Sequence, residues 1–190
     1  MNISSSLTLI AVFCAPLVAM IAYSSVRLTE RRTRWLFIAL ATALMVWAVP
    51  LVLVRADFLN ASAIATASRL TFLGGVLGVL GLYFFFEHFA GFSRGKVRYA
   101  ILINSIVLLT ATAFGLVEQG VQPSPVHLMP VRGPLHRYYV LSLVVTVIYS
   151  FLMIFLAYRK SESALLRFQL RSIGGYGFLG FLFPIINNGL

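Results

Sequence analysis

Tyr138–Tyr158 has the sequence YYVLSLVVTVIYSFLMIFLAY, in which no side chain carries a formal charge. A helix of about 20 apolar residues is long enough to cross the hydrocarbon core of a bilayer. Five further stretches also lack Asp, Glu, Lys and Arg: Met1–Val26, Trp35–Val54, Leu70–Phe86, Tyr99–Val117 and Ser172–Leu190. Lipid offers no partner for backbone polar groups, and these runs lack the alternation of barrel strands. The sequence therefore predicts an all-α fold, a polytopic bundle of six transmembrane helices.

Composition excludes a soluble domain. The chain of 190 residues is 60% hydrophobic and 11% charged, whereas a soluble domain carries roughly a quarter charged residues. No stretch rich in Ser, Pro or charge divides the chain, so residues 1–190 are expected to form one membrane domain surrounded by the lipid bilayer. The predicted spans have the approximate bounds 5–26, 35–54, 69–90, 99–117, 138–158 and 168–188.

The loops predict an orientation, because Lys and Arg mark the cytoplasmic side of short loops. Eleven of the 15 basic residues lie in the first, third and fifth loops, at residues 27–34, 91–98 and 159–171. These loops are expected in the cytoplasm and the N-terminus outside. Topology also explains the formal net charge of +10, so no nucleic-acid partner is expected. After six spans the chain would end outside, which predicts a seventh helix and a cytoplasmic output domain beyond Leu190.

No arrangement of residues predicts catalysis. The chain has no Gly-rich phosphate loop, no zinc-binding helix motif and no nucleophile elbow, and the spans contain no Lys. Cys14 is the single cysteine and is expected to pack as a small apolar residue. The spacing of His127 and His136, considered together with Glu118, fits no standard metal site. We therefore expect no catalytic residue, no metal, no cofactor and no enzyme activity in this chain.

Charged residues on the outer side are candidates for a ligand site. An anionic ligand could bind at a pocket mouth formed by Arg69, Glu118, Arg132 and Arg137. Anchoring at the membrane interface is the alternative role for the same side chains. Also expected on this side are Arg55, Asp57, His127 and His136. The connection over residues 118–137 contains four prolines, which predicts a semi-rigid loop over the outer end of the bundle.

Glycines in the third and sixth predicted spans are candidates for close helix contacts. Gly74 and Gly78 are four residues apart, and Gly81 lies on a neighbouring face, so that two helices can approach each other there. Gly174 and Gly175 have the same potential role in the sixth span. These glycines could pack against another helix of the same chain or form the contact face of a homodimer, and the sequence does not decide between the two.

Ionisable residues within a span are functional candidates by default, and the predicted spans hold few of them. Glu87 and His88 stand at the cytoplasmic end of the third span. Glu87 is expected to pair with Arg94 or Lys96 of the next loop, and a proton-coupling role is the alternative. Asn104 in the fourth span is expected to bridge two helices by a hydrogen bond.

The fifth loop predicts that the sixth helix begins inside the cytoplasm and runs into the membrane. Leu166 and Leu170 share one helical face, with Arg167 and Arg171 beside it. These basic side chains can reach anionic head groups. Ser163 is the predicted cap of this helix.

Three features of the sequence resemble a known family. Leu82–Gly91, LYFFFEHFAG, closes the third span with aromatic residues followed by a small residue and Gly, and Trp47 stands in the second span. The sixth span begins with Arg167–Gly175, RFQLRSIGG, and closes with Pro184 and the Asn pair at 187–188. In these features the chain resembles the N-terminal seven-helix membrane region of bacterial sensor histidine kinases.

The resemblance implies a sensory input region in the bacterial cytoplasmic (inner) membrane. Such a region detects a stimulus at the outer face or in the bilayer and relays it by helix repacking to a cytoplasmic transmitter domain in the same full-length chain. Kinase activity would belong to that domain. A small transporter or channel subunit is the alternative. A lipid-modifying membrane enzyme would need more His, Asp or Glu residues at the membrane face than this chain has.

Overall fold

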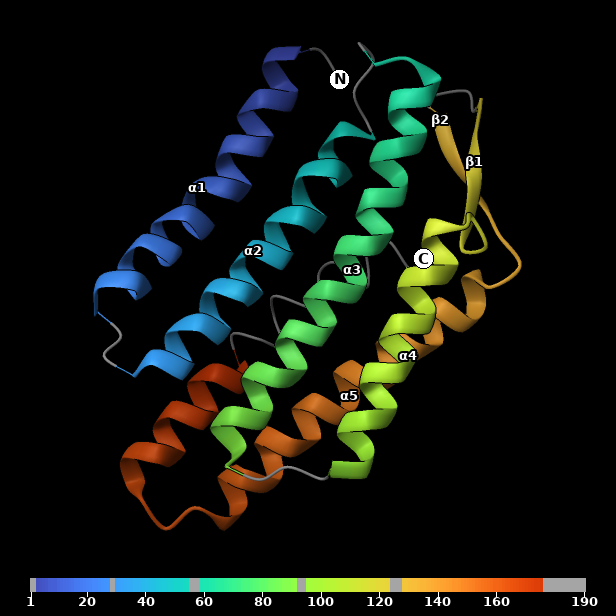
Figure 1. Cartoon of the computed structure of the whole chain (residues 1–190). Coiled ribbons are helices and arrows are strands. Elements are labelled where there is room, and N and C mark those ends of the chain that lie inside the picture. The colour runs from blue at the N-terminus through green and yellow to red at the C-terminus, as the bar shows by residue number, and fades with distance from the viewer. Residues whose placement is uncertain (1–2, 28–29, 55–58, 92–94, 124–127, 176–190) are drawn as a thin grey trace.

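The fold combines long helices with one two-stranded hairpin (Figure 1). A computed structural model of the protein describes residues 3–27, 30–54, 59–91, 95–123 and 128–175. In chain order the elements are α1 (Ile3–Arg27), α2 (Arg31–Leu53), α3 (Ala61–Ala90), α4 (Gly95–Ala113), β1 (Glu118–Pro123), β2 (Leu128–Arg132) and α5 (His136–Lys160). Residues 164–175 are also helical.

Helices α2, α3, α4 and α5 are long and apolar enough to cross a membrane. The apolar stretch of α1, Leu7–Tyr23, is shorter. Many outward side chains of α4 and α5 are large and apolar, among them Ile103, Ile106, Val107, Leu141, Val145 and Ile148. Soluble proteins rarely expose broad apolar faces of this kind, whereas lipid is a favourable surrounding for them. The protein is therefore a helical membrane protein.

The predicted helical bundle is confirmed. Of the six predicted spans, four correspond to helices of the described residues that are long and apolar enough to cross a membrane. The first predicted span falls within α1. Of the sixth, predicted over 168–188, residues 168–175 are helical and the others lie outside the described residues. The predicted start of this helix is confirmed, because the Leu166 N–H donates a hydrogen bond to Ser163 Oγ at 3.3 Å.

Helix α3 is the central element, since it contacts α2, α4, α5 and both strands. It is longer than the predicted span over 69–90, because it begins at Ala61. The Asn60 side chain caps its first turn, where Oδ1 accepts a hydrogen bond from the Ala63 N–H at 2.8 Å. Gly91 ends the helix with a φ of 69°, a left-handed conformation that glycine adopts without steric cost.

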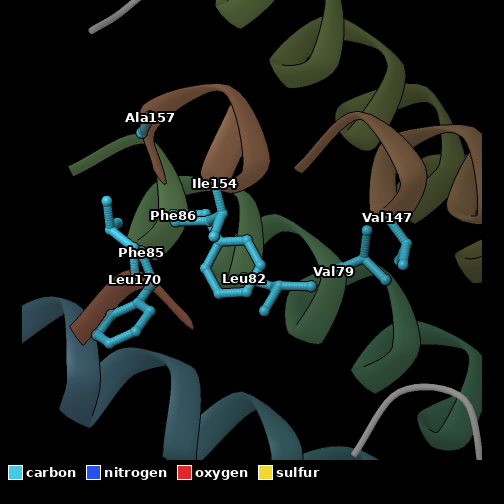
Figure 2. Close-up of a cluster of buried hydrophobic side chains, with 8 residues drawn as sticks. All are labelled: Val79, Leu82, Phe85, Phe86, Val147, Ile154, Ala157 and Leu170. Carbon is cyan, nitrogen blue, oxygen red and sulfur yellow. The ribbon is translucent and has the colours of Figure 1, made fainter. Parts of the chain in front are cut away.

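The main buried cluster joins α3, α5 and the helical segment 164–175 (Figure 2). Its members are Val79, Leu82, Phe85, Phe86, Val147, Ile154, Ala157 and Leu170. Phe86 is 1% exposed, and its ring lies 5.2 Å from the ring of Phe151 in an edge-to-face arrangement. A second cluster, nearer the hairpin, contains Val76, Leu108, Ala111, Val117 and Tyr139. Together the two clusters hold α5 against α3 along much of its length.

The all-α prediction is wrong between α4 and α5, where the expected proline-rich loop contains the antiparallel hairpin β1–β2. Pairing the two strands satisfies backbone groups that a loop at the membrane would leave without partners. Two hydrogen bonds close the base of the hairpin between the segment before β1 and the segment after β2: the Gly133 N–H donates to Val117 O and the Leu135 N–H to Leu116 O, each at 2.9 Å. Gly133 is required here because a Cβ atom would overlap the Leu116 carbonyl. The hairpin also contacts α3, as expected for a cap on the bundle.

The ends of the helices alternate between two ends of the bundle (Figure 1). The hairpin end holds β1–β2, the start of α1 and the start of α3. The basic end holds the end of α1, the start of α2, the end of α3, the start of α4 and the end of α5. Basic residues of the first, third and fifth loops gather at the basic end: Arg31, Arg32, Arg34, Lys96, Arg98, Arg159 and Lys160. The predicted alternation of basic and less basic loops thus corresponds to two ends of the bundle.

Candidate functional site

A buried carboxyl group lies at the hairpin end. Glu118, the first residue of β1, is 1% exposed, and neither of its carboxylate oxygens makes a hydrogen bond. Desolvation raises the pKa of Glu118 from 4.5 to about 6, and the positive charge of Arg69 opposes this rise. The Ser68 hydroxyl and the Gly120 N–H oppose it further, although neither reaches hydrogen-bond geometry with the carboxylate. Glu118 is thus enclosed by protein, whereas the sequence predicted it among the residues of a pocket mouth.

The structure brings together part of the predicted ligand site. Arg69 comes from α3, and its guanidinium lies beside the Gly115 turn, 3.7 Å from the position of a Cβ atom at Gly115. Arg132 is the cross-strand partner of Glu118 in the hairpin and is exposed. Arg137 is exposed in the first turn of α5. These four residues therefore lie at one end of the bundle, with Glu118 inside and the three arginines at the surface.

His136 is a second polar group beside the hairpin. Its Nδ1 atom is buried and has no hydrogen-bond partner, and its ring lies 5.7 Å from the Phe72 ring in an edge-to-face arrangement. The Tyr139 hydroxyl donates a hydrogen bond to Phe72 O at 2.8 Å, which joins α5 to α3 beside this ring. Three other residues predicted for this side lie outside the described residues: Arg55, Asp57 and His127.

The basic end contains a polar network between α2 and α3. The Thr33 hydroxyl donates a hydrogen bond to Glu30 Oε2 and lies 2.8 Å from His88 Nε2. Because a hydroxyl has a single hydrogen, which Thr33 gives to Glu30, His88 Nε2 must carry a proton and donate it to Thr33 Oγ1. His88 Nε2 is also 3.4 Å from Glu30 Oε1. The hydrogen bond from Thr33 holds the pKa of Glu30 below its usual value, and His88 adds to this effect.

Sequence reasoning singled out His88 but missed Glu30 and Thr33. These two residues are three positions apart at the start of α2, a spacing that allows their side chains to meet. Nothing in that spacing indicates His88, which is 55 residues away in the chain. The partner is determined by the packing of α3 against α2.

A second network at the basic end joins α3 to α4. Glu87 is 7% exposed, accepts a hydrogen bond from the Tyr83 hydroxyl at 3.0 Å, and lies 3.9 Å from Arg98 Nε. The Arg98 guanidinium also stacks 5.3 Å from the Phe84 ring centroid. The predicted pairing of Glu87 with Lys96 is wrong, and Arg94 lies outside the described residues. Arg98 stands in the first turn of α4, where side chains point back toward the helix start and so toward α3.

Three glycines of α3, Gly74, Gly78 and Gly81, face α2, as predicted for close packing within one chain, whereas Gly75 faces Tyr139 of α5. A Cβ atom at Gly74 would lie 2.6 Å from the Trp47 backbone, and one at Gly81 would lie 3.3 Å from Leu40 Cα. A Cβ atom at Gly78 would meet only the end of the Leu44 side chain, at 3.7 Å. In the helical segment 164–175, a Cβ atom at Gly174 would lie 3.2 Å from Ile154 of α5, and one at Gly175 would meet no atom of the described residues within 4 Å. The homodimer face stays a prediction.

Asn104 bridges two helices, as predicted. Its Oδ1 atom accepts a hydrogen bond from the Tyr138 hydroxyl, which joins α4 to the first turn of α5.

Comparison of the chain with models of protein families, with curated proteins and with solved structures found no match in any of the three.

Proposed function

We propose that this chain is the membrane-embedded sensory input region of a bacterial signal-transduction protein. In this proposal the protein is a two-component sensor histidine kinase in the bacterial inner membrane, and its transmitter domain belongs to the same full-length chain. The input region detects a stimulus at the outer face or in the bilayer and relays it by helix repacking. The resemblance of Leu82–Gly91 and Arg167–Gly175 to such regions supports this assignment.

The arrangement of α3 is the observation that carries the proposal. This helix has 30 residues and is therefore about 45 Å long at 1.5 Å per residue. Near its start it lies beside buried Glu118, and at its end Glu87 and His88 contact α4 and α2 respectively. One stiff element thus has a polar group at each end, which suits the relay of a displacement between the two faces of a membrane.

The contact between α3 and α2 supports a relay by sliding or rotation. Gly74, Gly78 and Gly81 let the two helices approach without long side chains between them. Small changes at such an interface are converted into alternative packings, because tightly packed faces do not deform continuously. We place the basic end in the cytoplasm, in agreement with the positive-inside rule, so that the hairpin end faces outward.

A glycine substitution in the full-length gene product tests the proposal. Gly81→Ala places a methyl group 3.3 Å from Leu40 Cα, so α2 must move by a few tenths of an ångström. We expect the basal cytoplasmic output to change by about two- to thirty-fold, the range of typical coupling energies, at an unchanged level of protein in the membrane. The measurement is the phosphorylation of the partner response regulator.

Thr66→Ala is the control on the same helix, because Thr66 is exposed and its hydroxyl donates to Ser62 O within α3. Its output should equal that of the unmodified protein. Equal output from Gly81→Ala, Thr66→Ala and the unmodified protein would contradict a relay through the α2–α3 interface. A full-length gene product without any phosphotransfer activity would overturn the assignment to sensor kinases.

A further inference from the structure

The environment of Glu118 is favourable for a neutral carboxyl group and unfavourable for a carboxylate. Its side chain is 1% exposed, and both oxygens lack hydrogen bonds within the part of the chain that the structure describes. A buried carboxylate without hydrogen bonds loses its hydration and gains little in return. Taking up one proton removes the charge and supplies an O–H donor, for which the Ser68 hydroxyl is a neighbouring acceptor.

The charged and titratable groups around Glu118 come from three elements. The positive charge of Arg69 in α3 attracts the carboxylate, but Arg69 is exposed, so water screens this attraction. Arg132 of β2 pairs with Glu118 in the strand register and is exposed as well. His136 of α5 lies beside the Val117 carbonyl, and its buried Nδ1 has no partner. The surrounding cations therefore reduce the cost of ionising Glu118 without removing it.

The position of Glu118 connects its charge to the seating of the hairpin. The preceding residue, Val117, is 0% exposed and accepts the hydrogen bond from the Gly133 N–H that closes the hairpin. Hydrating an ionised Glu118 requires this closed base to loosen, because water reaches neither oxygen in the closed form. We propose that Glu118 is a proton-binding site and that uptake of one proton from solution at the hairpin end tightens the seating of β1–β2 against α3.

This inference deepens the proposed function, because it identifies acidification at the hairpin face as a stimulus, and it rests on that function for the signalling step alone. Proton binding itself is independent of any output. The pKa of Glu118, about 6, lies above its usual value of 4.5. The stability that protonation contributes is therefore fully present below about pH 4.5 and is lost as the pH rises through about 6.

Infrared titration of the purified chain in lipid nanodiscs tests proton binding. We expect the band of a protonated carboxyl group to disappear as the pH rises through about 6, and to be missing from Glu118→Gln. Glu162→Gln is the control, because Glu162 is an exposed carboxylate at the other end of the bundle, and it should leave this band unchanged. A band at pH 5 that is equal in the wild-type and Glu118→Gln proteins would overturn the proposal, as would its absence from the wild-type protein.

Thermal unfolding over pH 5 to 8 provides the second measurement. The unfolding temperature of the wild-type protein should fall as the pH rises, while that of Glu118→Gln should vary less, because its amide is neutral throughout. If Glu118→Gln does not fold, Glu118→Asp keeps the carboxyl group on a shorter side chain, and its infrared titration should occur at a different pH. An infrared titration of Glu118→Asp that is identical to the wild-type one would also overturn the proposal.

The output of the full-length gene product separates this inference from the proposed function. Output that differs between external pH 5.5 and 7.5 in the wild-type protein, but not in Glu118→Gln, supports both. A confirmed infrared titration with output independent of pH contradicts acidification as the stimulus and leaves the proton site standing. An identical pH response of the output in the wild-type protein and in Glu118→Gln overturns the role of Glu118 in sensing.

Discussion

Two adjacent residues at the end of α3 have different partners because successive helical side chains point in different directions. Glu87 turns toward α4, where it meets Arg98, while His88 turns toward α2, where it meets Thr33. The sequence indicates both residues as candidates, since ionisable groups at the end of an apolar span are uncommon. Their partners depend on how three helices pack, so the sequence predicted Arg94 or Lys96 as the partner of Glu87 and did not indicate Arg98.

Removing the Thr33 hydroxyl should weaken the link between α2 and α3. Thr33 is 8% exposed and joins Glu30 to His88, so Thr33→Val leaves the His88 N–H without its closest acceptor. We expect a loss of about 1 kcal/mol in the free energy of unfolding, typical for one hydrogen bond in a partly buried network. The measurement is reversible unfolding of the purified protein in detergent.

Thr66→Val is the matched control for this substitution. Thr66 is exposed in α3, and its hydroxyl donates only to Ser62 O within the same helix. The control should change the free energy of unfolding by less than half as much as Thr33→Val. Equal losses in the two variants would show that the network at the basic end does not stabilise the contact between the helices.

At the scale of elements, a helix extends beyond its predicted span where a charged residue lies within the helix. Arg69 interrupts the uncharged run, so the third span was predicted to begin there, yet α3 begins at Ala61. A long basic side chain can extend from a helix to water or to an acidic partner without ending the helix. The guanidinium of Arg69 lies beside the Gly115 turn and near Glu118, and neither neighbour can be recognised in the sequence.

The hairpin was missed because prolines usually oppose strand formation. Pro130 lies opposite Val121 in the register, and Pro123 ends β1. A two-stranded hairpin has an unpaired edge on each strand, where the missing N–H of proline costs no ladder hydrogen bond. The prediction that this segment covers one end of the bundle was nevertheless confirmed by its contact with α3.

The closest approach of two helices should be the least tolerant of added volume. A methyl group at Gly74 would lie 2.6 Å from the Trp47 backbone, which cannot rotate away as a side chain can. Gly74→Ala should therefore lower the free energy of unfolding by about 1–3 kcal/mol, the typical cost of overpacking. Gly78→Ala is the control on the same face, where a methyl group meets only the flexible end of Leu44 at 3.7 Å. Equal stability of the two variants, measured by thermal unfolding in detergent, would contradict this packing.

At the scale of the whole molecule, hydrophobicity and loop charge predict the helices and the two ends of the bundle, although they do not predict single side-chain contacts. The apolar runs anticipate α2 to α5, and the alternation of basic loops anticipates the two ends of the bundle. Both signals are averages over many residues, so a wrong boundary or partner does not remove them. The burial of Glu118, in contrast, depends on a single contact, the hydrogen bond between Val117 and Gly133 at the base of the hairpin, and an average over the sequence does not predict it.

The two ends of the bundle should react differently with a reagent that cannot cross the membrane. Cys14 is the single cysteine, so Cys14→Ser gives a background without thiols. In this background Gln119→Cys places an exposed thiol on the hairpin, and Glu162→Cys places one just after the end of α5, at the basic end. Placing the basic end outside would require many Lys and Arg residues to cross the membrane, which is unfavourable. We therefore expect a membrane-impermeant maleimide to label Gln119→Cys in intact cells and to label Glu162→Cys only after the cells are opened. Labelling of Glu162→Cys in intact cells, with Gln119→Cys protected, would reverse the orientation and place Glu118 on the cytoplasmic side, where external acidity could not reach it.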